Sequence, residues 1–163
     1  MATSRKPHPP YDGRRYDFAD SVGYQLFAVA QAMRREVDRR MLQHDLTDAQ
    51  WKPLWMLRLG RATSAIELAR EMAVDAGAVT RMLDRLEAKG LLERVRSATD
   101  RRIVHLRLTP AGDAVARKVP FVLAAVNNEF LRGFSGAEWK QLRRLLGRMA
   151  DNGMLLQTDS EAA

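Results

Sequence analysis

The chain has 163 residues, of which 46% are hydrophobic and 29% are charged, and it carries a formal net charge of +7 and no cysteine. This length and balance predict one globular domain with a sizeable core, and the absence of cysteine excludes disulfides, thiolate catalysis and cysteine-based redox sensing. A pI near 10.3 indicates a polyanionic partner, and charge alone leaves DNA, RNA and an anionic lipid surface open. The sequence has no apolar run of membrane-spanning length and no signal-peptide core near its start, so we expect a cytoplasmic protein without a membrane partner.

The two ends of the chain are interpreted as accessory segments around a single domain over residues 18–157. Residues 1–17 contain three of the six prolines and four basic side chains. We interpret them as a flexible basic arm that touches phosphate or packs on a partner subunit, with a plain disordered tail as the alternative. Residues 158–163 are interpreted as a second disordered tail.

The first part of the domain is predicted to contain two helices. From Phe18 to about Gln43, apolar residues recur at intervals of three and four, which is typical of a long amphipathic helix. Tyr24 and Phe27 widen its apolar surface, so we expect this helix to contact two bodies. A capping box formed by Thr47 and Gln50 predicts the start of the second helix.

Residues 64–90 are predicted to form two short helices joined by a tight turn. A capping box formed by Ser64 and Glu67 begins the first helix, and Asp75 and Gly90 bound the second. We expect the buried side of each helix to consist of apolar residues at helical spacing. These are Ile66, Ala69, Met72 and Ala73 in the first helix, and Val79, Leu83 and Leu86 in the second.

The other side of the second helix begins with small residues and becomes basic along its length: Gly77, Thr80, Arg81, Asp84 and Arg85. A helix that reads the major groove of DNA needs this order, because bulk at its N-terminus would block the groove while Arg can reach a guanine or a phosphate. A solvated amphipathic face is the alternative. Asp84 is expected to form a solvated ion pair with Arg81, three residues earlier, instead of serving as a catalytic carboxylate.

Two runs rich in branched residues, 91–96 and 103–108, predict a β-hairpin after these helices. Its tip at residues 97–102 is polar and carries Arg101 and Arg102, which suit a narrow, electronegative minor groove. From Gly77 to Leu108 the chain has eight basic and four acidic side chains, so most of its net positive charge lies here. Residues 47–108 are therefore interpreted as a winged helix-turn-helix that binds DNA.

At these residues the sequence resembles the MarR family of bacterial transcriptional regulators. The matching motifs are ELA at 67–69, VTRMLDRLEAKGLLER at 79–94, the D-x-R of residues 100–102 and LTPAG at 108–112. The resemblance implies a mainly α fold with a small β-wing, and a homodimer that places its recognition helices in successive major grooves of a pseudo-palindromic, double-stranded operator. It also implies that Arg102 enters a minor groove. The predicted DNA contacts are Ser64, Asp75, Ala76, Gly77, Ala78, Thr80, Arg81, Arg85, Arg96, Arg101 and Arg102.

The last part of the chain is predicted to form long helices. Pro110 begins one of them, and Pro120 inside it predicts a kink near residues 116–117. A capping box formed by Ser135 and Glu138 begins the last helix, which we expect to reach about Leu156. A small winged domain does not need this much apolar surface for its own core. Residues 18–44 and 109–157 are therefore interpreted as dimerisation helices.

The family resemblance also implies a small ligand, often an aromatic or phenolic acid, that binds between the dimer helices and the DNA-binding part and weakens DNA binding. The residues that could line such a pocket and hold a carboxylate are Tyr24, Phe27, His44, Trp51, Trp55 and Arg58. The alternative is that the two tryptophans are ordinary core residues.

Signals for an enzyme are absent from the sequence. The three histidines are far apart, and the chain lacks the nucleophile elbow and the glycine patterns of nucleotide-binding loops. We therefore expect no enzymatic activity, no metal and no cofactor. The favoured hypothesis is a dimeric, ligand-responsive transcriptional repressor. A winged-helix architectural or protein-interaction module without ligand control is the alternative, followed by a small enzyme with an unfamiliar site.

Overall fold

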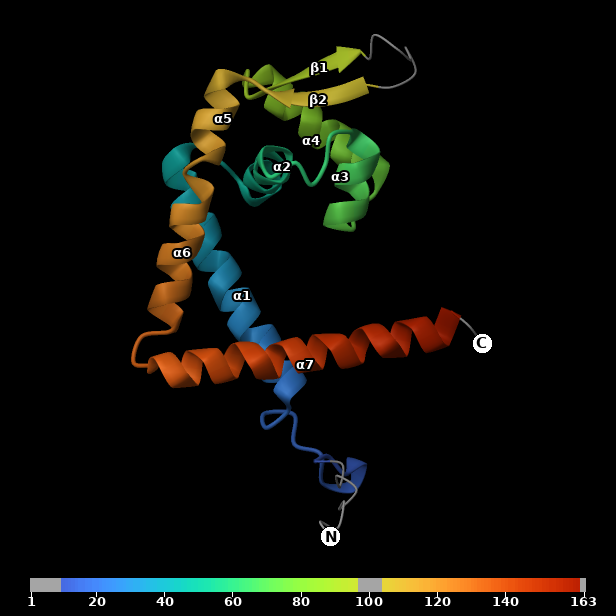
Figure 1. The fold of residues 1–163 in the computed structure, drawn as a ribbon, viewed down its shortest axis with the longest axis vertical. Coiled ribbons are helices and arrows are strands. Elements are labelled where there is room, and N and C mark those ends of the chain that lie inside the picture. The colour runs from blue at the N-terminus through green and yellow to red at the C-terminus, as the bar shows by residue number, and fades with distance from the viewer. Residues whose placement is uncertain (1–9, 97–103, 162–163) are drawn as a thin grey trace. The chain divides into compact units, whose positions relative to one another are not determined.

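The computed structural model describes residues 10–96 and 104–161, and it is mostly helical with one two-stranded sheet (Figure 1). This confirms the predicted fold class. The chain divides into two compact units, Met1–Val122 and Leu123–Ala163, a boundary that falls inside the region interpreted from sequence as one domain. Among the described residues, no helix is long and apolar enough to cross a membrane.

The first long helix, α1 (Val22–Met41), begins four residues later than the sequence predicts. The reason is its N-cap: the Ser21 hydroxyl accepts a hydrogen bond from the backbone N–H of Tyr24. Ser21 is itself held by the Tyr16 hydroxyl, which donates to Ser21 Oγ at 2.7 Å. Short 3₁₀ turns, η1 (Gly13–Arg15) and η2 (Leu42–His44), precede and follow the helix.

The next helices begin where the sequence predicts. Helix α2 (Asp48–Arg58) has the capping box of Thr47 and Gln50, and α3 (Ala65–Met72) has that of Ser64 and Glu67. The predicted inner face of α3 is wrong, because Ile66 is 83% exposed and Ala73 is exposed, while Leu68 is fully buried. Two residues correspond to about 200° around a helix, so a core that receives Leu68 turns Ile66 outward. Ala69 and Met72 are half-buried.

Helix α4 (Ala76–Ala88) follows α3 after a tight turn, as predicted. Ala73 in this turn has a φ of 52° and its backbone N–H bonds the carbonyls of Ala69 and Arg70. The predicted stripe is confirmed, because Val79, Leu83 and Leu86 are all buried.

The predicted hairpin is also confirmed, with the first strand starting one residue later than expected. Strands β1 (Leu92–Arg96) and β2 (Val104–Leu108) pair antiparallel, with Leu92 opposite Leu108 and Arg96 opposite Val104. The backbone N–H of Leu106 donates to the Thr63 carbonyl at 2.8 Å, which joins the hairpin to the start of α3. Residues 97–103, which include the predicted DNA contacts Arg101 and Arg102, lie outside the described residues.

After the hairpin the chain forms α5 (Pro110–Ala116) and α6 (Val119–Phe130), with a break at residues 117–118. The predicted kink is thus a full interruption. Pro120 causes it, because a proline lacks the N–H that would bond the carbonyl four residues earlier and its ring crowds that carbonyl. Helix α7 (Gly136–Glu161) has the predicted capping box of Ser135 and Glu138. It runs past Leu156 and includes residues 158–161, which the sequence placed in a disordered tail.

One backbone contact joins α5 to the turn between α4 and β1. A Cβ added at Gly112 would lie 1.7 Å from the Leu91 carbonyl oxygen, so only glycine fits at this position. The Thr109 N–H donates to the same carbonyl at 3.2 Å, and the Thr109 hydroxyl donates to the Gly90 carbonyl at 2.6 Å. Position 112 therefore sets how closely α5 approaches the start of the wing.

We expect Gly112→Ala to lower the free energy of unfolding by about 1–3 kcal/mol or more, because the backbone must move apart to admit the methyl group. Urea denaturation checks this. Gly136→Ala is the control, since nothing lies within 4 Å of a Cβ at Gly136. Equal stability of the Gly112→Ala variant and the wild type would contradict the contact.

Candidate nucleic-acid interface

The outer face of α4 is built as the sequence predicts. Gly77, Thr80, Arg81, Asp84 and Arg85 are all exposed, while the opposite stripe of the helix is buried. The Asp75 carboxylate accepts a hydrogen bond from the Ala78 N–H at 2.8 Å and so caps the helix. An exposed helical face that starts with small residues and continues with arginines matches the geometry of a major-groove reader.

Gly77 leaves room for a guanidinium over the first turn of α4. A Cβ at Gly77 would lie 3.1 Å from Asp75 Oδ1 and 3.4 Å from Arg81 Nη1. A larger side chain would therefore push Arg81 away from this turn. The Thr80 hydroxyl donates to the Ala76 carbonyl at 2.9 Å, so its hydrogen is already used within the helix.

A three-residue ion-pair cluster joins the second half of α4 to the wing. Arg94 Nη2 lies 2.7 Å from Asp84 Oδ1, and Arg94 Nη1 pairs with the Glu87 carboxylate. The backbone N–H of Arg94 also donates to Glu87 at 3.3 Å. The pairing of Asp84 with Arg81 that the sequence suggested is therefore wrong. From the sequence, Arg94 is recognised only as a positive charge. No local spacing indicates that a strand residue pairs with a helix residue ten positions earlier.

The start of α3 is fixed by Glu67. Its carboxylate accepts hydrogen bonds from the backbone N–H and the hydroxyl of Thr63 and from the N–H of Ser64. The bonds from Thr63 hold the pKa of Glu67 below its ordinary value, because they favour the charged carboxylate. In turn, the Ser64 hydroxyl accepts from the Glu67 N–H at 3.3 Å.

The predicted DNA contacts fall into three groups. The largest group shares the N-terminal part of α4 and its cap: Asp75, Ala76, Gly77, Ala78, Thr80, Arg81 and Arg85. Ser64 caps α3, and Arg96 ends β1. Arg101 and Arg102 belong to the wing tip outside the described residues. Arg81 and Arg85 also line a hollow of about 200 Å³ with Thr47, Ala49 and Gln50 at the start of α2. Of the predicted arginine contacts that the structure describes, Arg81 and Arg85 lie on the exposed face of α4 and Arg96 lies at the end of the following strand.

The six residues predicted to line a ligand pocket do not gather in the single chain. Tyr24 and Phe27 are exposed on the first turns of α1, and from Phe27 to the end of α1 the axis rises about 20 Å. His44 lies in η2 beyond that end. On α2, Trp51 is a buried core residue and Trp55 is half-buried.

Arg58, the sixth predicted ligand residue, already has a carboxylate partner. Its guanidinium pairs with Asp113 on α5, and Asp113 also pairs with Arg117 at 2.6 Å. A contact across 55 residues of sequence carries no local signal, so the sequence could not assign it. The pair links α2 to α5 within the first unit.

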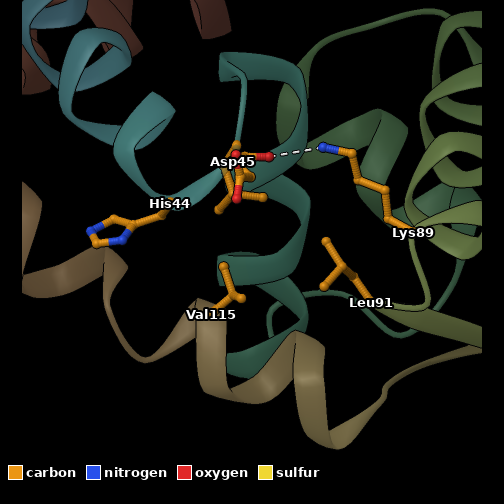
Figure 2. A pocket seen from close by; sticks show the side chains of 6 residues that line it. His44, Asp45, Lys89, Leu91 and Val115 are labelled. Carbon is orange, nitrogen blue, oxygen red and sulfur yellow. Dashed lines mark hydrogen bonds between the residues drawn. The ribbon is translucent and has the colours of Figure 1, made fainter.

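An open hollow of about 280 Å³ lies at the other end of α4 (Figure 2). It is lined by the η2–α2 connection, the end of α4 and α5: His44, Asp45, Leu46, Lys89, Leu91 and Val115. Lys89 Nζ donates to the Asp45 carbonyl at 2.8 Å. In Figure 2 the side chains of Leu91 and Val115 point into the space beside this bond, and the His44 ring points away from it.

Comparison with known proteins places these features in one family. A family model described as MarR family matches residues 46–104. The reduced form of MarR from E. coli is 31% identical, with a TM-score of 0.72, and the match covers 79% of this chain and 96% of that chain. A mutant MarR from E. coli complexed with operator DNA is also 31% identical, with a TM-score of 0.68 and coverage of 78% and 91%.

A third similar structure is BpsR of Bordetella bronchiseptica, solved to explain the regulation of its DNA binding by 6-hydroxynicotinic acid. It is 29% identical with a TM-score of 0.70, and the match covers 83% of this chain and 97% of that chain. The coverage of all three structures extends well beyond the winged helix-turn-helix.

Glu67→Gln tests the anchor at the start of α3. Because the folded pKa of Glu67 is lowered, its carboxylate stabilises the fold above the ordinary pKa of 4.5, and this contribution is lost as the pH falls through the lower folded value. We expect the variant to be less stable than the wild type at neutral pH, and the gap to narrow on acidification below 4.5. Urea denaturation across a pH series measures this difference in the free energy of unfolding. A difference that stays constant with pH would refute the lowered pKa of Glu67.

Proposed function

Because the chain belongs to the MarR family of winged-helix transcriptional regulators, we propose that it acts in the cytoplasm as a homodimeric repressor bound to a pseudo-palindromic operator. The family and the similar solved structures are DNA-binding regulators rather than enzymes. The observation that carries the proposal is the outer face of α4, where Gly77 makes room for Arg81 at the end of the helix that must insert into the groove.

The homodimer is supported by apolar surface that one copy leaves exposed. On α1 the exposed large apolar side chains include Val22, Tyr24, Leu26, Phe27 and Val29. On α7 they include Trp139, Leu145, Leu146, Met149 and Met154. Monomeric proteins rarely leave large apolar surfaces in water, and a two-fold dimer is the commonest way to cover such surfaces. Two recognition helices then meet half-sites about 34–36 Å apart on DNA.

A small ligand is proposed to control the DNA binding of this protein. The DNA binding of BpsR is regulated by 6-hydroxynicotinic acid, and we extend the same class of effector, a small aromatic acid, to this chain. Such a ligand weakens DNA binding if it binds a dimer whose recognition helices no longer match the spacing of the grooves. Arg58 is paired with Asp113 through Nη1, so a carboxylate that binds Arg58 shares the guanidinium with Asp113 or displaces it.

Arg81→Ala tests the role of α4 in DNA recognition. We expect specific DNA binding to weaken by about 1–3 kcal/mol, because the variant loses a guanidinium that reaches a base or phosphate. Arg35→Ala is the matched control, since Arg35 is an exposed arginine on α1 and its loss changes the net charge equally. Fluorescence anisotropy with a selected operator duplex measures both. Equal affinities of the two variants would refute a specific contact by Arg81.

The dimer is tested by the double variant Leu145→Glu, Leu146→Glu on α7. Two carboxylates in an apolar interface lose their hydration without gaining partners, so we expect a monomer that no longer binds the full operator. Ile66→Glu is the control, because Ile66 is an exposed apolar residue on α3, outside the proposed dimer surface. Sedimentation velocity distinguishes the two species. A double variant that remains dimeric would contradict the assigned interface.

A further inference from the structure

The first turn of α4 carries a carboxylate and a guanidinium on either side of a glycine. A Cβ built on Gly77 would lie 3.1 Å from Asp75 Oδ1 and 3.4 Å from Arg81 Nη1, so both groups border the space that this glycine leaves open. All three residues are exposed. Two opposite charges therefore lie next to each other at the end of α4 that meets DNA in the proposed function.

Both groups have hydrogen-bonding capacity that the described parts of the chain leave unused. Asp75 caps the helix through Oδ1 alone, and no described donor lies on Oδ2. The guanidinium of Arg81 has no hydrogen bond or ion pair with another described residue. The Thr80 hydroxyl lies on the same face, but its hydrogen is already used within the helix. The first turn therefore presents an acceptor on Asp75 beside donors on Arg81, and Thr80 does not compete as a donor.

We propose that Asp75 and Arg81 together read one C·G base pair of the operator, with Asp75 on the cytosine and Arg81 on the guanine. In the major groove, cytosine presents its N4 amine as a donor, while guanine presents O6 and N7 as acceptors. Asp75 Oδ2 accepts from the cytosine amine, and the Arg81 guanidinium donates to the two guanine atoms. Because Gly77 has no side chain, the edge of the base pair can approach between the two groups. This inference rests on the proposed DNA-binding function and names the base pair that is read there.

The other base pairs fit this pair of side chains less well. A guanine or a thymine in place of the cytosine turns an acceptor toward the Asp75 carboxylate, so the two acceptors repel each other. An adenine keeps an amine for Asp75, but its thymine partner offers Arg81 only one acceptor, O4, where guanine offers two. The expected order of affinity is therefore C·G first, A·T second, and G·C and T·A last.

Asp75→Asn tests the cytosine contact and keeps the helix cap, because asparagine caps a helix as well as aspartate does. The wild type first selects an operator from random duplexes, and each C·G pair of its half-site is then replaced in turn by the other three pairs. Since asparagine pairs with adenine N6 and N7, we expect the variant to raise the ratio of affinities for A·T over C·G at one position at least about tenfold. Fluorescence anisotropy measures this ratio, in which the general effect of the lost charge cancels. Asp20→Asn, which removes an exposed carboxylate before α1, is the control and should keep the wild-type ratio.

The guanine contact is tested at the same base pair with 7-deazaguanine, which lacks the N7 acceptor. This duplex should bind the wild type about tenfold more weakly than the unmodified duplex, since a hydrogen bond from a charged group is lost, and it should not weaken Arg81→Ala further. An Asp75→Asn variant that keeps the wild-type base preference at every position would overturn the proposal. An equal effect of 7-deazaguanine on the wild type and Arg81→Ala would overturn it as well. A wild type that selects no motif would instead overturn the proposed function, and this inference with it.

Discussion

The backbone of Leu91 passes so close to Gly112 that a side chain cannot fit between them, and the placement of the DNA-reading elements depends on this approach. Leu91 lies between α4 and β1, and Gly112 lies in the first turn of α5. Thr109 adds two hydrogen bonds across the same joint, to the carbonyls of Leu91 and Gly90. One contact therefore positions the recognition helix, the wing and the start of the helices that lead to the second unit.

Around this joint, ion pairs and hydrogen bonds hold the second half of α4, while the outer face of its first turn stays exposed. Arg94 ties Asp84 and Glu87 to the wing, and Lys89 ties the end of the helix to the start of α2. The first turn instead presents small residues and Arg81, with no side chain at Gly77 to block a groove. This arrangement suits a reader of DNA, since contacts on the second half fix the direction of the helix and the exposed first turn is left for the base edges.

The sequence predicted those parts of the structure that local chemistry decides. The capping boxes and the buried stripe of α4 depend on neighbouring residues, and they were confirmed. Pro120 also acts locally, although it breaks the helix instead of kinking it. The predicted buried side of α3 was wrong, because packing against elements distant in sequence decides which side is buried. The core receives Leu68, and Ile66 faces water. The same distinction holds for the site. The exposed face of α4 follows from helical periodicity and was predicted, whereas the pairs Arg94–Asp84 and Arg58–Asp113 join residues on different elements and are visible only in the fold.

The central claim is that two copies of α4 read specific DNA, and selection from a pool of random duplexes at physiological salt tests it most directly. Sequencing of the retained fraction should reveal a pseudo-palindrome whose half-sites are about one helical turn apart, as a dimer with paired recognition helices requires. A retained pool without any motif, bound with an affinity that simply collapses as salt rises, would contradict the claim. The basic surface would then bind phosphate without reading sequence, as in an architectural module.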